Sequence, residues 1–291
     1  MKTEIAPFFR YGFPLVFTTI SMYLLSLGDR YLMKYMLDLG DVGVYSLGYK
    51  IATVTNILVI QSFQTGFLPI AYRMYEEPGK ERFFRKTLTY YTFVLVIFSL
   101  ALSLFSEEII TFLSRDEEYY IAYTIVPLIS LALIFKGIQY VFSLSLHFVK
   151  NTKYNAFIVL SVALFNLLLN YLLLPAMGIY GAGLASITSF LIMLIVFRIY
   201  AKRFYDPGYE IKKLVLMILL GIGLYLVSLL FKGLPVAPVV LIKGLMVISF
   251  PFILYLFGFY ERIELERIRG AIRKWSKPAK WYKNLKDFRD K

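Results

Sequence analysis

Four charged side chains lie within or at the ends of long apolar runs, and they are the residues best suited to bind a polar ligand. Asp29 and Arg30 are adjacent at the end of the first apolar run, and Lys50 lies near the start of the second. Lys136 lies near the middle of a later run, PLISLALIFKGIQY. A charge at the centre of a membrane helix costs at least about 2.5 kcal/mol and usually marks a path for something polar. These residues favour a cationic site in a hydrated cavity.

Each of these groups also has a structural interpretation. Asp29 and Arg30 could form an ion pair at the membrane rim with no further role, and Lys136 could pair with a backbone carbonyl or an acid on another helix. Amides also recur inside the apolar runs, among them Gln61, Gln64, Gln139, Asn166 and Asn170. Amides of this kind often bond between helices, for about 0.6 kcal/mol on average. Helix packing and ligand contact both stay open for them.

The elements that must position these residues are eight apolar segments. Their ranges are approximately 11–28, 46–70, 87–106, 121–146, 155–176, 180–197, 214–231 and 238–259. Each is long enough to cross a hydrocarbon layer of about 30 Å at about 1.5 Å per residue. They show no alternation of period two, and backbone groups in lipid must bond within their own segment, so each segment is expected to be a helix. The sequence therefore predicts an all-α integral membrane protein with about eight spans.

Composition supports this class and disfavours several functions. Of the 291 residues 59% are hydrophobic, against about 45–50% in soluble domains. There are no cysteines and His147 is the single histidine, so cysteine-type and multi-histidine metal sites are excluded. No secretory signal peptide is evident before the first span. Nothing resembles a P-loop, an Asp-x-Asp sugar-nucleotide site or a Ser/His/Asp set. We expect neither an enzyme nor a bound cofactor or metal.

The connections between the spans differ in charge. The first side comprises the N-terminus, the loops 73–86, 150–153 and 198–213, and the tail from Glu261. It carries 25 of the 32 lysines and arginines, and the other side carries five. Because cytoplasmic loops are enriched in Lys and Arg, both termini are expected in the cytoplasm of a bacterial or archaeal cell, with the protein in the cytoplasmic membrane. The net charge of +13 then reflects topology, and no nucleic-acid partner is expected.

The basic tail differs in kind from the rest. Leu265, Ile268, Ile272 and Trp275 recur at helical spacing, and Trp281 and Tyr282 follow Pro278. This pattern predicts an amphipathic helix on the inner leaflet, attracted by anionic lipid. A solvated basic tail that only enforces topology is the alternative.

The segment YGFPLVFTTISMYLLSLGDRYLMKYMLDLGDVGVYSLGYKIA resembles the start of the second helical lobe in polysaccharide-export flippases of the Wzx type. The similarity lies in the Y-G-x-P-L opening, the D-R at the helix end and V-G-x-Y-S-x-x-Y-K-I-A. The later NYLLLPAMGIYGAGLAS is similar to that family's connection between the fifth and sixth helices of a lobe. Together these motifs cover about sixty residues, and the number of spans extends the match over most of the chain.

The resemblance implies a place in the superfamily that also contains MATE drug exporters and lipid II flippases. Such proteins have two six-helix lobes around a central cavity, with an optional extra helix pair. The chain then divides into one lobe (1–200), a helix pair (201–260) and the tail (261–291). The first lobe has no counterpart in this sequence. It could be supplied by a longer protein, by a separate chain or by a second copy, because a lone lobe would expose polar groups to lipid.

The resemblance also implies the substrate, an oligosaccharide on undecaprenyl pyrophosphate moved to the outer leaflet by alternating access. The candidate cations are Arg30, Lys50 and Lys136, with Asp29 orienting Arg30. The candidate sugar or helix contacts are Gln61, Gln64, Gln139 and Asn170. Three alternatives stay open: a MATE-like exporter, a membrane-embedded sugar polymerase, and a subunit that only scaffolds a glycan-export complex. The exporter would need a buried carboxylate, which no predicted span contains, and the polymerase would need a large outer loop.

Overall fold

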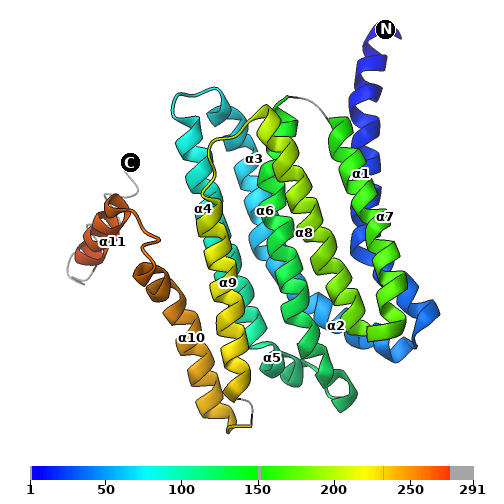
Figure 1. The fold of residues 1–291 in the computed structure, drawn as a ribbon, viewed down its shortest axis with the longest axis vertical. Helices are drawn as coiled ribbons and strands as arrows, with labels where there is room; N and C mark the ends of the chain where they lie inside the picture. The colour runs from blue at the N-terminus through cyan, green and yellow to red at the C-terminus, as the bar shows by residue number, and fades with distance from the viewer. Residues whose placement is uncertain (1, 150–151, 232, 276–291) are drawn as a thin grey trace. The chain divides into compact units, whose positions relative to one another are not determined.

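The computed structural model describes residues 2–149, 152–231 and 233–275, and within them the regular structure is entirely helical (Figure 1). The elements, in chain order, are α1 (Lys2–Met36), α2 (Leu39–Thr55), the π-helical η1 (Asn56–Gln61), α3 (Ser62–Tyr75), α4 (Lys80–Leu104), α5 (Ser106–Leu113), the 3₁₀-helical η2 (Glu117–Thr124), α6 (Ile125–Phe148), α7 (Thr152–Met177), α8 (Ile179–Phe204), α9 (Ile211–Ser228), the 3₁₀-helical η3 (Leu229–Phe231), α10 (Val236–Leu256) and α11 (Arg262–Trp275). The predicted all-α membrane fold is confirmed.

Seven helical stretches of the described residues are long and apolar enough to cross a membrane. They are Leu39–Tyr75, Lys80–Leu104, Glu117–Phe148, Tyr154–Met177, Ile179–Phe204, Ile211–Phe231 and Val236–Leu256. Each contains, or nearly contains, one of the predicted spans from the second to the eighth. The first predicted span, 11–28, lies within the single long helix α1. Length and apolar character therefore located the helices correctly, because backbone groups in hydrocarbon can be satisfied only within the helix itself.

The chain forms two compact units, residues 1–247 and 248–291. In the first unit α6 is the central helix, because it is apolar on nearly every side and buried along most of its length. It packs against α2, α4 and α8, while α1 packs against α7 and α9 packs against α4. In Figure 1, α3, α6 and α8 end, and α4, α7 and α9 begin, at one end of this bundle. The connections thus alternate between two ends, as a membrane topology requires.

The second unit contains the end of α10 and the helix α11. Within it the Tyr260 hydroxyl donates to the Pro251 carbonyl oxygen over 3.3 Å. The helix predicted at the start of the tail is present as α11, whereas Pro278, Trp281 and Tyr282 lie outside the described residues. Its attachment to lipid stays a prediction, as do the domain boundaries at 200 and 260.

The connection between α7 and α8 is a close helical hairpin, and two glycines permit it. Gly178 has a φ of +55°, which side chains disfavour, and its amide donates to the Leu174 carbonyl oxygen to end α7. At Gly181 an added Cβ would lie 2.5 Å from the Leu173 carbonyl oxygen. The tight turn expected from the sequence is therefore present, and it brings α7 and α8 together along their length.

Replacement of Gly181 should loosen this hairpin. We expect Gly181→Ala to lower the free energy of unfolding by about 1–3 kcal/mol, because a backbone atom must move to admit the new methyl group. Thermal unfolding of the purified chain in detergent measures the change. Gly223→Ala, in α9, is the matched control because nothing lies within 4 Å of an added Cβ there. Equal effects of the two substitutions would contradict the packing argument.

The connection between α8 and α9 is fixed by two ion pairs. Arg198 donates through Nη2 to Asp206 Oδ2 over 2.9 Å, and the Gly208 amide donates to Asp206 Oδ1 over 3.1 Å. Glu210, just before α9, accepts from the Thr89 hydroxyl over 2.9 Å. Lys86, which is on α4 as Thr89 is, also pairs with Glu210, over 3.4 Å. Glu210 therefore attaches the start of α9 to α4.

Acid should weaken this attachment. Burial alone would raise the pKa of Glu210, but the hydrogen bonds from Lys213 and Thr89 and the charges of Lys213 and Lys86 hold it below its ordinary 4.5. A carboxyl with a depressed folded-state pKa stabilises the fold fully above its unfolded-state pKa, and that stability is lost as the pH falls through the folded-state pKa. Glu210→Gln should thus lower the melting temperature at neutral pH and flatten its decline below pH 4.5. The control is Glu77→Gln, an exposed loop residue; if it flattened the decline equally, Glu210 would not be responsible.

Candidate functional site

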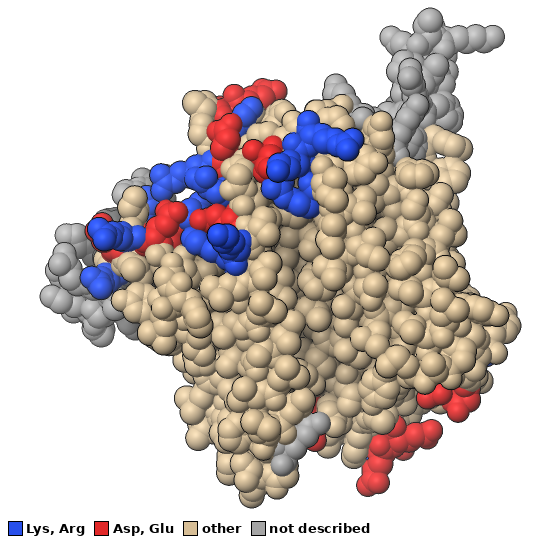
Figure 2. Space-filling view, viewed as in Figure 1, with Lys and Arg blue, Asp and Glu red and all other residues tan. Residues whose placement is uncertain are grey.

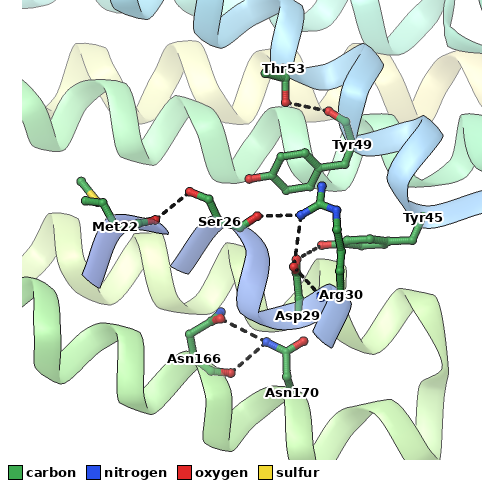
Figure 3. A network of polar contacts seen from close by, with 9 residues as sticks. All are labelled: Met22, Ser26, Asp29, Arg30, Tyr45, Tyr49, Thr53, Asn166 and Asn170. Atoms are coloured by element: carbon green, nitrogen blue, oxygen red, sulfur yellow. Dashed lines mark hydrogen bonds and ion pairs between the residues drawn. The ribbon is translucent and has the colours of Figure 1, made fainter. Parts of the chain in front are cut away.

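Asp29 is a carboxylate buried inside the helical bundle, 1% exposed. The Tyr45 hydroxyl, from α2, donates to Asp29 Oδ2 over 2.6 Å, and the Arg30 backbone amide donates to Oδ1 over 2.8 Å (Figure 3). The Arg30 guanidinium completes the set, 3.2 Å from Oδ1. A buried charge is tolerated only when it is paired and hydrogen-bonded, and here both oxygens are satisfied. The predicted ion pair is therefore present within α1, and the hydrogen bond from Tyr45 to Asp29 connects α1 to α2.

The guanidinium of Arg30 is held in one orientation. Its Nη1 donates to the Ser26 carbonyl oxygen over 2.6 Å as well as to Asp29, and its Cζ lies 4.1 Å from the ring centroid of Tyr49. Stacking on an aromatic face stabilises a cation whose edges stay free to donate. Guanidinium has five N–H donors, and both side-chain hydrogen bonds of Arg30 come from Nη1. Among the described residues no hydrogen bond uses its Nε or Nη2, so these groups can donate to a phosphate, which arginine binds through two parallel hydrogen bonds.

Lys50, Gln61 and Gln64 lie away from the network around Asp29. Lys50 follows Tyr49 in sequence, but it is exposed and takes no part in the network around Asp29. Gln61 is exposed and Gln64 is half-buried. Gln61 is the last residue of η1, a π-helical turn inside an otherwise continuous helical stretch. π-Helical turns are rare, and those that occur are frequently at functional sites. They rotate the residues that follow them.

Lys136 has a partner that the sequence interpretation did not identify. Its Nζ donates to the side-chain oxygen of Asn56 over 3.3 Å, which connects α6 to the first residue of η1. The expected alternatives were a backbone carbonyl or an acid, and the structure supplies an amide in place of either. The Tyr91 hydroxyl, beside Gly137, is buried with no hydrogen-bond partner among the described residues. Lys136 and Asn56 thus form a polar contact inside an apolar bundle.

The remaining amides bind mainly to one another and to neighbouring helices. Asn170 donates through Nδ2 to the Asn166 backbone oxygen over 2.9 Å and to its side-chain oxygen over 3.1 Å. Asn166 donates to the Ser189 hydroxyl over 3.0 Å, which connects α7 to α8. Gln139 is buried at 4% exposure. For Asn166 and Asn170 these contacts support helix packing, although the side-chain oxygen of Asn170 has no partner in the described part of the chain.

Of the eight predicted site residues, only Asp29 and Arg30 are directly joined. The residues that complete their site, Ser26, Tyr45 and Tyr49, were not assigned from the sequence. Both tyrosines lie in the segment VGVYSLGYKIA, at positions 45 and 49, so a signal was present. Their spacing of four residues on α2 places both rings on the side that meets Arg30. Among the described residues no group of three or more His, Cys, Asp or Glu could hold a metal ion.

Comparisons with known proteins give a family match over part of the chain and a match of fold over most of it. Residues 2–75 match the model of the polysaccharide biosynthesis protein family. The fold matches the solved structure of lipid II flippase MurJ in its inward closed conformation, with a TM-score of 0.69 and 20% sequence identity. The predicted resemblance to proteins of polysaccharide synthesis is supported over residues 2–75, and the match to MurJ concerns the fold. The match covers 89% of this chain and 57% of MurJ, so the chain spans little more than half of that protein's length. A search of curated proteins gave no match.

The Tyr45 hydroxyl should stabilise the fold through Asp29. Tyr45→Phe removes the donor to Oδ2 and leaves half of a buried carboxylate unsatisfied, which costs about 1–3 kcal/mol. We expect a lower melting temperature in detergent. Tyr31→Phe, on the exposed side of α1, is the control because Tyr31 is 68% exposed. A melting temperature unchanged in Tyr45→Phe would show that the carboxylate does not need this hydrogen bond.

Proposed function

We propose that this chain is the second half of a flippase that moves undecaprenyl-pyrophosphate-linked oligosaccharide across the cytoplasmic membrane for surface polysaccharide synthesis. The observation that carries the proposal is Arg30, a cation fixed by buried Asp29 within a lobe that has the fold of a lipid flippase. Moving a pyrophosphate through hydrocarbon requires a cation to bind it. Removing that cation from water costs free energy, and the protein must already compensate this cost. Asp29 and the two tyrosine rings provide that compensation for Arg30.

The proposed roles follow from where each group lies. Arg30 binds the pyrophosphate through its uncommitted N–H groups, and Asp29 orients it. Lys136 offers a second cation near the middle of a span, and Lys50 a third on the exposed side of α2. The candidate sugar contacts are the amides Gln61, Gln64, Gln139 and Asn170. If transport follows alternating access, the Asp29–Arg30 pair is proposed to form the outer gate, because this pair lies toward the end of the first predicted span.

We further propose that the working transporter includes a second lobe that faces α2, η1 and α3. Lys50, Gln61, Ser62 and Thr65 are all exposed on this stretch, although it is long and apolar enough to cross a membrane. Polar side chains facing hydrocarbon are costly, so a protein partner or a water-filled cavity is expected to cover them. The lobe could belong to a second copy, to a separate chain or to the rest of a longer protein.

The charge distribution supports a cytoplasmic location for the end of the bundle where α8 ends and α9 begins. Figure 2 shows Lys and Arg side chains, with acidic ones among them, gathered around that end, while the opposite end shows acidic side chains and no basic ones in this view. The positive-inside bias therefore favours the orientation predicted from the sequence, in a bacterial or archaeal cytoplasmic membrane.

The buried carboxylate of Asp29 keeps a MATE-like exporter of small cations as the second candidate. The sequence placed Asp29 at the end of a span and found no acid inside one, whereas the structure buries Asp29 within α1. Such exporters need a carboxylate that is free to bind a cation. Here the Arg30 guanidinium occupies one oxygen and the Tyr45 hydroxyl the other, which favours the anionic substrate.

Export measurements test the proposal. The full chain is co-expressed or reconstituted with whatever supplies the other lobe, and flipping of an undecaprenyl-pyrophosphate oligosaccharide is measured. We expect Arg30→Gln and Lys136→Ala each to lower the rate about tenfold or more, because a charge-assisted contact to the headgroup is lost. Lys34→Gln is the control, an exposed cation one turn beyond Arg30 on α1. Normal export by folded Arg30→Gln would exclude Arg30 from the site, and efflux of small cations in place of the glycolipid would favour the exporter.

A further inference from the structure

A polar cavity lies between α5, α9 and the first turns of α10. Its volume is about 540 Å³, within the range of about 300–1,000 Å³ that is usual for small-ligand sites. Its lining combines charged and hydroxyl-bearing side chains, Glu107, Glu108, Lys243 and Ser228 among them, with the aromatic ring of Phe112. None of the residues around Asp29 and Arg30 belongs to it. The cavity is therefore separate from the proposed substrate site.

The charges in this cavity are only partly matched. Lys243 is 8% exposed and donates to Glu108 Oε1 over 2.6 Å. The other carboxylate oxygen, Glu108 Oε2, is buried without a hydrogen-bond partner in the part of the chain that the structure describes. Glu107, next to it, also lines the cavity. The cavity thus offers a buried carboxylate oxygen that lacks a donor and a buried ammonium group with N–H donors that Glu108 does not use. An unsatisfied buried carboxylate oxygen is costly, and a ligand that donates to it is favoured.

An apolar cavity adjoins the polar one. Its volume is about 340 Å³, and it lies between α4, α6 and α9. The two cavities share the lining residues Ser103 and Tyr225. Most of the apolar cavity is lined by aliphatic side chains, but it also contains Ser99 and Ser130. Both serines are almost fully buried, and the structure gives their hydroxyls no partner within the described ranges. The pair of cavities thus suits a molecule with a charged head and an apolar chain.

We propose that this double cavity binds one phospholipid whose head carries a phosphate and a primary ammonium group, as phosphatidylethanolamine does. The phosphate binds Lys243, which has three N–H donors and uses one of them for Glu108. The ammonium group donates to Glu108 Oε2 and to Glu107. One acyl chain occupies the apolar cavity, where the hydroxyls of Ser99 and Ser130 can donate to the ester carbonyl.

The charges distinguish this lipid from other amphiphiles. A pyrophosphate-linked glycolipid carries only negative charge in its head, so it would add negative charge beside Glu107 and Glu108 and bring no ammonium group to them. A purely cationic amphiphile would pair with the carboxylates but would leave the remaining N–H donors of Lys243 without an anionic acceptor. A neutral glycolipid would bring neither an anionic acceptor for Lys243 nor a cationic donor for Glu108 Oε2. A head with both signs, the positive one able to donate hydrogen bonds, supplies both.

Lipid-binding measurements on the full chain test the inference. The protein is purified in detergent, stripped of lipid, and incubated with equal amounts of phosphatidylethanolamine, phosphatidylcholine and phosphatidylglycerol. Native mass spectrometry then counts the molecules retained. We expect one tightly retained phosphatidylethanolamine, several-fold more than phosphatidylcholine, whose ammonium has no N–H, and more again than phosphatidylglycerol, which has no ammonium.

Two variants make the test specific. Glu107→Gln, at an exposed position, should lower the preference for phosphatidylethanolamine several-fold without changing the melting temperature of the lipid-free protein. Glu117→Gln, an exposed acid of η2 outside both cavities, should leave the preference unchanged. Equal retention of the three lipids, a preference for phosphatidylglycerol, or the same loss in both variants would overturn the proposal. The flipping assay on Arg30 does not depend on this result, so the two proposals fail separately.

Discussion

The fold depends on how a membrane helix satisfies its own carboxylate in surroundings that cannot solvate that group. Asp29 is buried within α1, and its two oxygens are satisfied from two directions, by Tyr45 on α2 and by Arg30 on α1 itself. The carboxylate in turn compensates the guanidinium, whose remaining donors stay unused. Removing either partner would leave an isolated charge in a region of low dielectric constant, where burying that charge costs about several kcal/mol. The Asp29 carboxylate therefore connects α1 to α2 through Tyr45, and it allows Arg30 to present a positive charge at low energetic cost.

The same constraint explains the other polar side chains of the bundle. Lys136 reaches Asn56 on the neighbouring stretch, Asn166 reaches Ser189, and Lys243 reaches Glu108, so these three side chains pair across helix interfaces. Other polar groups lie at a cavity or at a surface. Glu108 Oε2 borders the polar cavity, and Lys50 and Gln61 lie on the exposed side of α2 and η1. Because unpaired polar groups are expensive in a membrane, those positions are where ligands or protein partners are expected.

These two surfaces suggest different uses. The exposed polar side of α2, η1 and α3 fits a second lobe around a hydrated path, in keeping with a chain that spans 57% of MurJ. The cavity beside α5 and α10 has a mixed charge that suits a resident zwitterionic lipid better than a transported anion. A flippase must bind its substrate weakly enough to release it, whereas a structural lipid can be bound tightly.

Sequence by itself determined the class of the protein, the positions of seven membrane-crossing stretches and the adjacency of Asp29 and Arg30. Hydrophobic length, charge asymmetry and the order of short motifs are local properties, and the bilayer permits few structures besides helices. The tertiary structure decided the partners: Tyr45 for Asp29, Asn56 for Lys136, Ser189 for Asn166, and Glu108 for Lys243, which are 16, 80, 23 and 135 residues apart in the chain. It also decided that Lys50 lies exposed while its neighbour Tyr49 stacks on Arg30. Such choices depend on the rotation of each helix about its axis, which packing against other helices fixes and which no periodicity along one segment records.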